Sequence, residues 1–257
     1  MFLAIDIGNT NITLGLFDGE KLGPSWRYAS GRYGLPDEFG ASMIGFLKVA
    51  GCPARAVTAV AIASVVPSLT ESVTAAVVRY LNCRPLVVDG AAATGLRILY
   101  DDPAQVGADR IVDAVAGYRI YGGPVCIIDF GTATTFDAVT GDGEYLGGAI
   151  VPGIVTAADA LFERTAKLPR VSLARPPSVI GKNIAHSLQS GLLYGYIGLV
   201  EGLVARFRAE MGSSMKVIAT GGLAAIIAKE TAVISVVAPW LTLEGLRIVY
   251  LLNSGDE

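Results

Sequence analysis

The sequence predicts an α/β fold built from two similar domains. Strand-like and helix-like segments alternate along the 257 residues, a pattern typical of α/β proteins. Hydrophobic residues make up 52% of the chain and charged residues 17%, which indicates a globular protein with a substantial core. An internal repeat gives the two halves the same order of elements.

The repeat pairs residues 2–22, FLAIDIGNTNITLGLFDGEKL, with residues 125–146, VCIIDFGTATTFDAVTGDGEYL. Each copy runs from an apolar strand through Asp-x-Gly and a polar turn to a second strand, an Asp-Gly turn and a third strand. Glycine and proline in residues 118–124 mark a break between the copies. We therefore expect an N-terminal domain at 1–119 and a C-terminal domain at 120–257.

The individual elements follow from hydrophobic periodicity and from the positions of turn residues. Strands are expected near 2–7, 11–18, 57–66, 86–88, 96–100, 124–130, 134–140, 144–151, 215–220 and 232–237. Helices are expected near 36–50, 67–81, 103–120, 153–166, 181–211, 221–229 and 241–252.

Charge and cysteine content limit the partners and the compartment. The net charge of −3 gives no reason to expect nucleic acid or an anionic membrane as a partner. Cys52, Cys83 and Cys126 are odd in number and widely spaced, which argues against a disulfide framework or a zinc site. Asp6 arrives too early for a signal peptide, and the charge-free run 183–200 contains several polar residues. We expect a cytoplasmic protein without a membrane span.

The first Asp-x-Gly turn is suited to phosphate binding. Asp6 ends a strand, and Gly8 can adopt positive φ and let a ligand approach the backbone. The following N–H groups can donate to phosphate oxygens. Thr10, Asn11 and Thr13 add uncharged side-chain donors. Because a carboxylate repels phosphate, Asp6 indicates Mg²⁺ or ordered water between the two.

The second copy repeats this arrangement with Asp129, Gly131, Thr132, Thr134 and Thr135. The alternative is an ordinary hairpin whose Asp and Asn side chains bond their own turn. Two copies in matching contexts favour phosphate binding. A third turn, VIATGGLA at 217–224, follows a strand and opens a helix, so the amides of Gly221 and Gly222 could bind the other end of a nucleotide. The chain has no G-x-x-x-x-G-K-[ST], G-x-G-x-x-G or G-x-S-x-G motif.

A helix is predicted to begin within YDDPAQVGADR, residues 100–110. Asp102, Pro103 and Gln105 fit the N-cap, N1 and N3 positions. That start places Asp109 and Arg110, which are adjacent in the sequence, about two turns into the helix.

Asp109 and Arg110 are candidates for catalysis and substrate binding. A carboxylate beside an arginine could accept a proton from a substrate hydroxyl, while the arginine holds a substrate carboxylate. The alternative is a solvated helix face that carries Asp109, Arg110 and Asp113. The residues alone leave both interpretations open.

Four glycines at 191, 195, 198 and 202 share one face of a predicted helix. Glycine lowers helix stability, so a close neighbour should compensate. That neighbour could be the sheet or the same helix of a second subunit, which would make a symmetric dimer. The lone histidine, His186, fits a helix-surface or capping role better than catalysis.

Eight segments in order, DIGNTN, VGADR, DFGTATTFD, YLGGAIVPGI, LFERTAKLP, GKN, QSG and ATGGLA, resemble type III pantothenate kinase over nearly the whole chain. The resemblance implies the acetate/sugar kinase–Hsp70–actin superfamily, with two ribonuclease-H-like (actin-like ATPase) domains, mixed sheets flanked by helices, and a nucleotide cleft between them. It also implies ATP-dependent phosphorylation of the pantothenate 4′-hydroxyl, the first step of coenzyme A biosynthesis. The implied enzyme is a homodimer that needs Mg²⁺ and a monovalent cation, K⁺ or NH₄⁺.

The resemblance also assigns roles to individual residues. ATP would be bound by Asp6, Ile7, Gly8, Asn9, Thr10, Asn11, Ile12, Thr13 and Thr132. Pantothenate would be bound by Tyr100, Gly107, Ala108, Asp109 and Arg110, with Asp109 as the catalytic base. Asp129 would bind the monovalent cation, and Asp6 would bind Mg²⁺ directly or through water. The family has a substrate-contacting threonine after GKN, whereas this chain has Ile184, so a hydroxyl contact is missing.

Two other functions remain open at this point. A kinase of the same fold could act on a sugar or another small alcohol, and Ile184 keeps that possibility open. A non-catalytic regulator is the third possibility, because relatives of this kinase fold include transcription-associated proteins. The intact polar turns and the absence of a basic stripe in the sequence argue against it.

Overall fold

The computed structural model describes residues 1–32, 34–89 and 92–255 and divides the chain into two compact units. The first unit comprises Met1–Ile120 and Trp240–Glu257, and the second comprises Tyr121–Pro239. The division after Ile120 falls within the glycine- and proline-containing segment. Residues 240–257, which were expected in the C-terminal domain, lie in the first unit instead.

Five strands in each unit have the same topology. The strands of the first unit are β1 (Phe2–Ile7), β2 (Asn11–Asp18), β3 (Lys21–Ala29), β4 (Ala59–Ser64) and β5 (Leu86–Val87), in the order β3-β2-β1-β4-β5. Those of the second are β7 (Val125–Phe130), β8 (Ala133–Val139), β9 (Glu144–Pro152), β10 (Lys216–Thr220) and β11 (Val236–Val237), in the order β9-β8-β7-β10-β11. In each, three antiparallel strands are extended by two parallel ones. The sequence repeat is therefore a structural repeat.

Helices cover both faces of the first sheet. They are α1 (Pro36–Val49), α2 (Pro67–Leu81), α3 (Ala108–Tyr121) and α7 (Leu241–Ser254), and the short elements are η1 (Ser30–Arg32), η2 (Ala54–Ala56), η3 (Pro103–Gln105) and β6 (Arg97–Ile98). Leu3, Ile5 and Ile7 of β1 pack with α1 and α2, whereas Phe2 and Ala4 pack with α3 and α7. Because side chains alternate along a strand, Asp6 lies on the α3 and α7 face.

The apolar face of α7 explains why the end of the chain returns to the first unit. Leu243, Leu246 and Val249 are at most 1% exposed and pack in one cluster with Phe2 and Phe17. Burying three such side chains stabilises the fold by about 1.5–3 kcal/mol each relative to exposure. Nothing in the local sequence indicates which of two similar sheets they cover.

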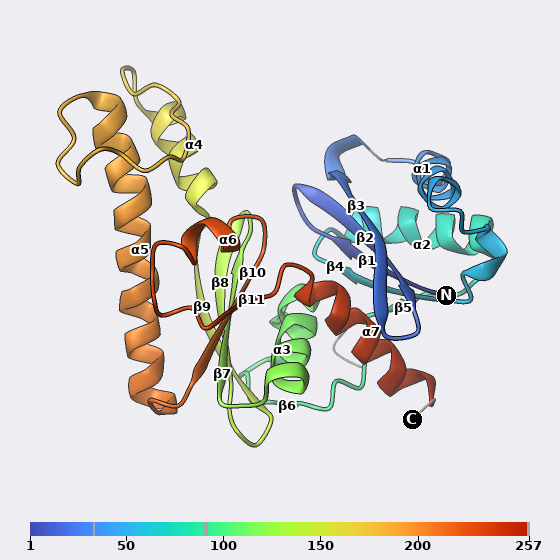
Figure 1. Ribbon diagram of the computed structural model, residues 1–257. Helices are drawn as coiled ribbons and strands as arrows, with labels where there is room; N and C mark the ends of the chain where they lie inside the picture. The colour runs from blue at the N-terminus through green and yellow to red at the C-terminus, as the bar shows by residue number, and fades with distance from the viewer. Residues whose placement is uncertain (33, 90–91, 256–257) are drawn as a thin grey trace. The chain divides into compact units, whose positions relative to one another are not determined.

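One long helix packs across the second sheet. The helices of this unit are α4 (Ile154–Arg164), α5 (Ile184–Met211) and α6 (Ala224–Ile227), and α5 is drawn in orange in Figure 1. By length and a mean hydropathy of 1.2, α5 could cross a membrane, but its buried face, which includes Leu193 and Val200, belongs to the core. Asn183, and not His186, is the N-cap of α5, because its side-chain oxygen accepts a hydrogen bond of 2.8 Å from the His186 amide.

The helix predicted at 103–120 is divided. Asp102 does cap a turn, because its Oδ1 accepts from the Ala104 amide at 3.1 Å, but that turn is the short η3. Val106 then adopts an extended conformation, and α3 begins afresh at Ala108. Asp109 therefore lies in the first turn of α3, and the prediction that it lies two turns into a helix was wrong.

Candidate active site

The first Asp-x-Gly turn is closed by backbone hydrogen bonds. The Gly8 N–H donates to the Asn11 carbonyl at 3.0 Å, so this amide is already used within the turn. Gly8 does not adopt positive φ, contrary to the role considered for it. A β-carbon at Gly8 would lie 3.2 Å from the Asn11 carbonyl oxygen, so the residue serves a close backbone approach.

Side chains around this turn divide into buried and exposed sets. Ile7 and Ile12 are 0% exposed and belong to the core, so they could meet ATP only through their backbone. Thr13 is 5% exposed, and its Oγ1 accepts a long hydrogen bond of 3.4 Å from Arg27 Nε. The exposed residues are those at the tip, Asn9, Thr10 and Asn11.

The second turn has the same plan but is shorter. Asp129 pairs with Thr135 across the strands, whereas Asp6 pairs with Thr13, so the second turn has one residue fewer. The Gly131 N–H donates to the Ala133 carbonyl at 3.1 Å. Thr132 is exposed at the tip.

Thr134 is not available to a ligand as the sequence pattern indicated. Its side chain is 1% exposed, and its Oγ1 accepts a hydrogen bond of 2.5 Å from the Tyr196 hydroxyl of α5. The hydroxyl at this position therefore joins β8 to α5. Sequence reasoning could not find this role, because the partner lies far along the chain.

The third predicted turn meets the second one at Gly221. Gly221 has a φ of 89°, and a β-carbon there would collide with Asp129 Oδ1 and lie 2.7 Å from the Phe130 carbonyl oxygen. The Asp129 carboxylate and the backbone of Phe130, both its nitrogen and its oxygen, thus leave no room for a side chain at Gly221. Helix α6 that follows has only four residues, shorter than the predicted 221–229, so a helix-terminus site for phosphate is not supported here.

The start of α3 positions the carboxylate of Asp109. The Arg110 amide donates to Asp109 Oδ1 at 2.8 Å, and a β-carbon at Gly107 would lie 2.5 Å from the same oxygen. That β-carbon would also lie 3.6 Å from Val65 Cγ1, and the Val65 N–H donates to the Ile7 carbonyl at 3.1 Å. Val65 therefore links the end of β1, where the first turn begins, to the start of α3.

Burial raises the pKa of the Asp109 carboxyl above its ordinary value, and the Arg110 amide and positive charge partly oppose that shift. Arg110 and Asp113 are only 8% and 2% exposed. The alternative of a solvated helix face was therefore wrong. A partly buried carboxyl with a raised pKa at the start of a helix is a candidate proton acceptor.

The family model of type III pantothenate kinase matches residues 2–206. This chain belongs to the type III pantothenate kinase family. A type III pantothenate kinase of Moorella thermoacetica is 52% identical over 254 residues, which cover 99% of this chain and 100% of the relative.

Solved structures support the fold of this family member. A Campylobacter jejuni protein assigned to the Baf family of transcriptional activators has a TM-score of 0.63 at 19% identity and covers 99% of this chain and 100% of its own. A ROK family glucokinase of Streptomyces griseus, in complex with glucose and AMPPNP, has a TM-score of 0.54 at 14% identity and covers 99% of both chains. At identities this low, the structural similarity shows the fold alone. It confirms the predicted α/β fold with two mixed sheets flanked by helices.

A cavity of about 740 Å³ borders the start of α3 in this pantothenate kinase family member. Its lining includes Ser64 at the carboxyl end of β4, Gln105 of η3, and Gly107 and Ala108. Two predicted substrate residues therefore line an open space. The other four do not line it. Asp109 and Arg110 follow the lining residues along α3. Tyr100 is half-buried near η3, and Ile184 is 52% exposed at the start of α5 in the second unit.

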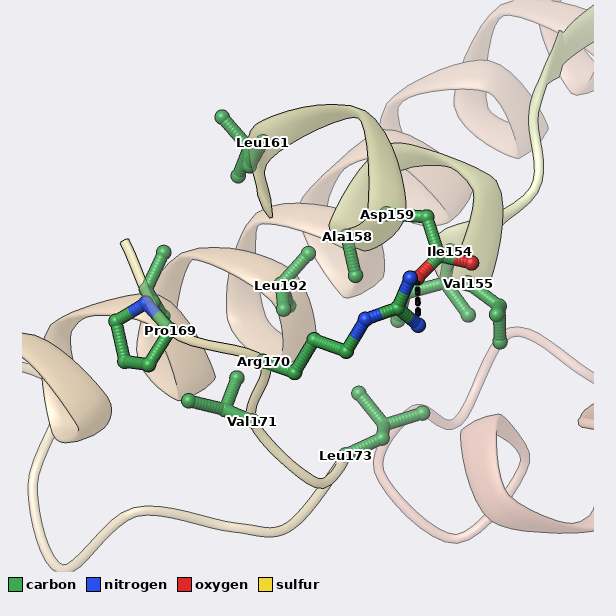
Figure 2. Close-up of a pocket in the computed structure, with 11 residues that line it drawn as sticks. Ile154, Val155, Ala158, Asp159, Leu161, Pro169, Arg170, Val171, Leu173 and Leu192 are labelled. Carbon is green, nitrogen blue, oxygen red and sulfur yellow. Dashed lines mark ion pairs between the residues drawn. The ribbon is translucent and has the colours of Figure 1, made fainter. Parts of the chain in front are cut away.

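A smaller cavity of about 250 Å³ lies in the second unit between α4, residues 169–173 and α5. Figure 2 shows the Arg170 side chain crossing it to Asp159, with 2.8 Å between the Nη1 and Oδ1 atoms. The Arg170 guanidinium also lies 4.6 Å from the Phe162 ring centre. None of the predicted site residues lines this cavity, so we interpret the pair as an attachment of the following loop to α4.

The oxygen donors near the first turn fit a divalent metal. Within residues 1–32, 34–89 and 92–255, no group of three His, Cys, Asp or Glu side chains could hold a metal. Mg²⁺ commonly binds one or two carboxylates together with substrate phosphates and water, and Asp6 beside the first turn suits that mode.

Proposed function

We propose that this protein transfers the γ-phosphoryl group of ATP to the 4′-hydroxyl of pantothenate, the first step of coenzyme A biosynthesis. The 52% identity to a type III pantothenate kinase over 254 residues is the observation that carries the proposal. The partly buried carboxyl of Asp109, which directly follows two residues that line an open cavity, and the two polar turns support it.

We further propose that Asp6–Thr13 and Thr132 bind ATP. Asn9 and Thr10 are exposed and can contribute polar groups, whereas Ile7 and Ile12 contribute backbone only. Bound Mg²⁺ would supply charge neutralisation on the phosphates, with Asp6 as its protein ligand. Asp129 would hold K⁺ or NH₄⁺. Phosphoryl transfer requires mainly positioning and electrostatic stabilisation, which these groups provide.

Asp109 is the base in this proposal. Its carboxylate accepts the proton of the 4′-hydroxyl as the hydroxyl oxygen attacks the γ-phosphorus of ATP and ADP leaves. Gly107, Ala108, Arg110 and Tyr100 complete the acceptor site. The buried Arg110 keeps a positive charge next to the carboxylate, which limits how far burial can raise its pKa.

A coupled ADP-release assay tests the function. Wild-type protein with ATP, Mg²⁺ and pantothenate should release ADP in the presence of K⁺ or NH₄⁺, and replacing the cation by Na⁺ should reduce the rate. Sugars and other small alcohols form the comparison panel. A preferred acceptor other than pantothenate would favour the alternative kinase, and no pantothenate-dependent ADP release would contradict the proposal.

A regulatory function is the second candidate, because the Campylobacter jejuni structure is assigned to a family of transcriptional activators. That likeness shows the fold alone. Salt-dependent DNA binding without phosphoryl transfer would favour regulation. Retained phosphoryl transfer and no DNA binding would favour the kinase.

Replacing Ile184 by Thr is expected to lower KM for pantothenate about three- to tenfold, by restoring a hydroxyl that can form one hydrogen bond to the substrate. Turnover at saturation and KM for ATP should stay unchanged. Ile184→Val is the matched control, because it keeps the branched shape without a hydroxyl. Equal KM values for pantothenate in the Thr and Val variants would show that position 184 does not contact the substrate.

We propose that the protein is a homodimer joined through α5, in the cytoplasm and without membrane or nucleic-acid partners. A β-carbon at Gly191, Gly195 or Gly198 would meet nothing within 4 Å, so the sheet is not the neighbour that these glycines accommodate. Exposed apolar residues precede them, with Ile180 80% exposed and Ile184 52% exposed. The remaining candidate is the same helix of a second copy.

Gly198→Leu is expected to convert the dimer to a monomer, because a leucine side chain would block close approach of two helices. The change should not lower helix stability, since leucine ranks just below alanine in helix propensity, and glycine is about 0.8–1 kcal/mol less favourable than alanine. Light scattering after size-exclusion chromatography measures the mass. Gly45→Leu, on the exposed face of α1, is the control and should leave the dimer intact. A dimeric Gly198→Leu protein would place the interface elsewhere.

A further inference from the structure

A hydroxyl group ties the first polar turn to the end of β3. Ser30 is 3% exposed and directly follows β3. Its Oγ donates to the Gly8 carbonyl at 2.6 Å, and its N–H donates to the Thr10 carbonyl at 3.0 Å. One residue therefore holds two carbonyl groups of the turn proposed to bind phosphate.

The second turn is tied at the corresponding place. Asn11 pairs with Ala29 in the first unit, and Ala133 pairs with Pro152 in the second, so Ser30 and Gly153 occupy equivalent positions after the third strand. The Gly153 N–H donates to the Thr132 carbonyl at 3.0 Å, which reproduces the backbone bond made by Ser30.

The hydroxyl group that holds the second turn comes from a residue at a different position. A β-carbon at Gly153 would lie 2.5 Å from the Thr132 carbonyl oxygen and would collide with that of Gly131, so serine does not fit there. Instead, Thr156 in the first turn of α4 donates from Oγ1 to the Thr132 carbonyl at 2.6 Å. Both copies thus place a hydroxyl on a turn carbonyl, by two different routes.

The direction of the held carbonyls matters for an anion. In a trans peptide the carbonyl of one residue and the N–H of the next point in opposite directions. Holding the Gly8 carbonyl on Ser30 directs the Asn9 N–H to the opposite side, and holding the Thr132 carbonyl on Thr156 does the same for Ala133. A phosphate near these turns then meets donors, whereas rotated peptides would present repelling oxygens.

We propose that Ser30 and Thr156 are positioning residues for the ATP phosphates, each acting through the turn carbonyl that it holds. This inference rests on the proposed kinase function and adds two residues that the sequence motifs do not contain. Neither residue contacts the acceptor in this proposal, so their effect should be confined to the nucleotide.

The test compares Ser30→Ala and Thr156→Val with wild-type protein. Loss of one hydrogen bond should raise KM for ATP about fivefold and leave KM for pantothenate within about twofold. Calorimetry should show an ADP dissociation constant raised by about the same factor. Thr156→Ser keeps the hydroxyl and should restore wild-type values.

Matched controls remove comparable hydroxyl-to-carbonyl bonds elsewhere. Ser72 Oγ donates to the Gly34 carbonyl at 3.0 Å, and Thr165 Oγ1 donates to the Leu161 carbonyl at 2.7 Å. Ser72→Ala and Thr165→Val should leave nucleotide affinity unchanged.

Unchanged ADP affinity in Thr156→Val would overturn the proposal for the second turn, even if Ser30→Ala does not fold. Equal rises in KM for ATP and for pantothenate would also overturn it, because they indicate a general structural role. ADP affinity needs no acceptor, so this result stays separate from whether pantothenate is the substrate.

Discussion

Asp109→Asn is expected to lower kcat for pantothenate phosphorylation by about 10²–10⁴-fold, the range measured for loss of a general base. Asparagine keeps the size of the side chain but cannot accept the substrate proton. In the wild type the Arg110 N–H donates to the Asp109 carboxylate at 2.8 Å, and the side-chain oxygen of asparagine can accept the same hydrogen bond. Steady-state kinetics measure the effect, and Asp142→Asn, in an exposed turn of the second unit, is the control.

The pH dependence of this variant separates catalysis from folding. Burial raises the pKa of Asp109, so wild-type kcat/KM should fall, as pH decreases, at a higher pH than for an ordinary carboxyl group. In folding, a raised pKa contributes stability at pH values below the unfolded-state pKa, and that stability is lost as pH rises through the folded-state value. Asp109→Asn should therefore be at least as stable as wild type at neutral pH. Full activity in this variant would exclude Asp109 as the base.

Gly221→Ala is expected to reduce kcat about 100-fold, because misplacing a positioning group by about 1 Å can cost that much. A methyl group there would displace the Asp129 carboxylate or the Phe130 backbone, and the φ of 89° is itself unfavourable for alanine. The rate of ADP release should also lose most of its dependence on K⁺. Kinetics with and without K⁺, together with thermal unfolding, measure both effects.

Gly51→Ala separates backbone strain from displacement of Asp129. Gly51 has a similar φ of 69°, but a β-carbon there meets nothing within 4 Å. It should lower the free energy of unfolding by about 1–2 kcal/mol, the cost of a left-handed conformation. Gly221→Ala should cost roughly 2 kcal/mol more, as overpacked sites do. Equal stabilities and a retained K⁺ response would show that Asp129 is not held by Gly221.

Local sequence predicted much of the fold because the same strand and turn pattern occurs twice in the chain. The predicted helix at 67–81 matches α2, and the repeat of Asp-x-Gly turns gives the topology shared by both sheets. Strand β3 is less evident: its residues are mostly exposed or half-buried, and Gly23 and Pro24 lie opposite a register shift between Gly15 and Phe17. Proline fits an edge strand at such an irregularity, but it weakens the apolar pattern.

Features that depend on tertiary contacts could not be predicted from local sequence. Gly107 and Asp109 were placed on one helix, because nothing in the sequence marks the extended conformation of Val106. No sequence motif marks Ser30 or Thr156, because the carbonyl groups that they hold belong to turns more than 20 residues away in the sequence. Aligning the two copies beyond their third strands pairs Ser30 with Gly153, which does not reveal the hydroxyl of Thr156.

The return of α7 to the first unit affects the order in which the protein can fold during synthesis. Helix α7 leaves the ribosome after the whole second unit, yet it covers Phe2 and Phe17, which are synthesised before that unit. The second unit, Tyr121–Pro239, is complete before that cover exists. The apolar surface of the first unit therefore stays uncovered until α7 is made. A nascent chain that stops near Pro239 is a natural substrate for chaperones.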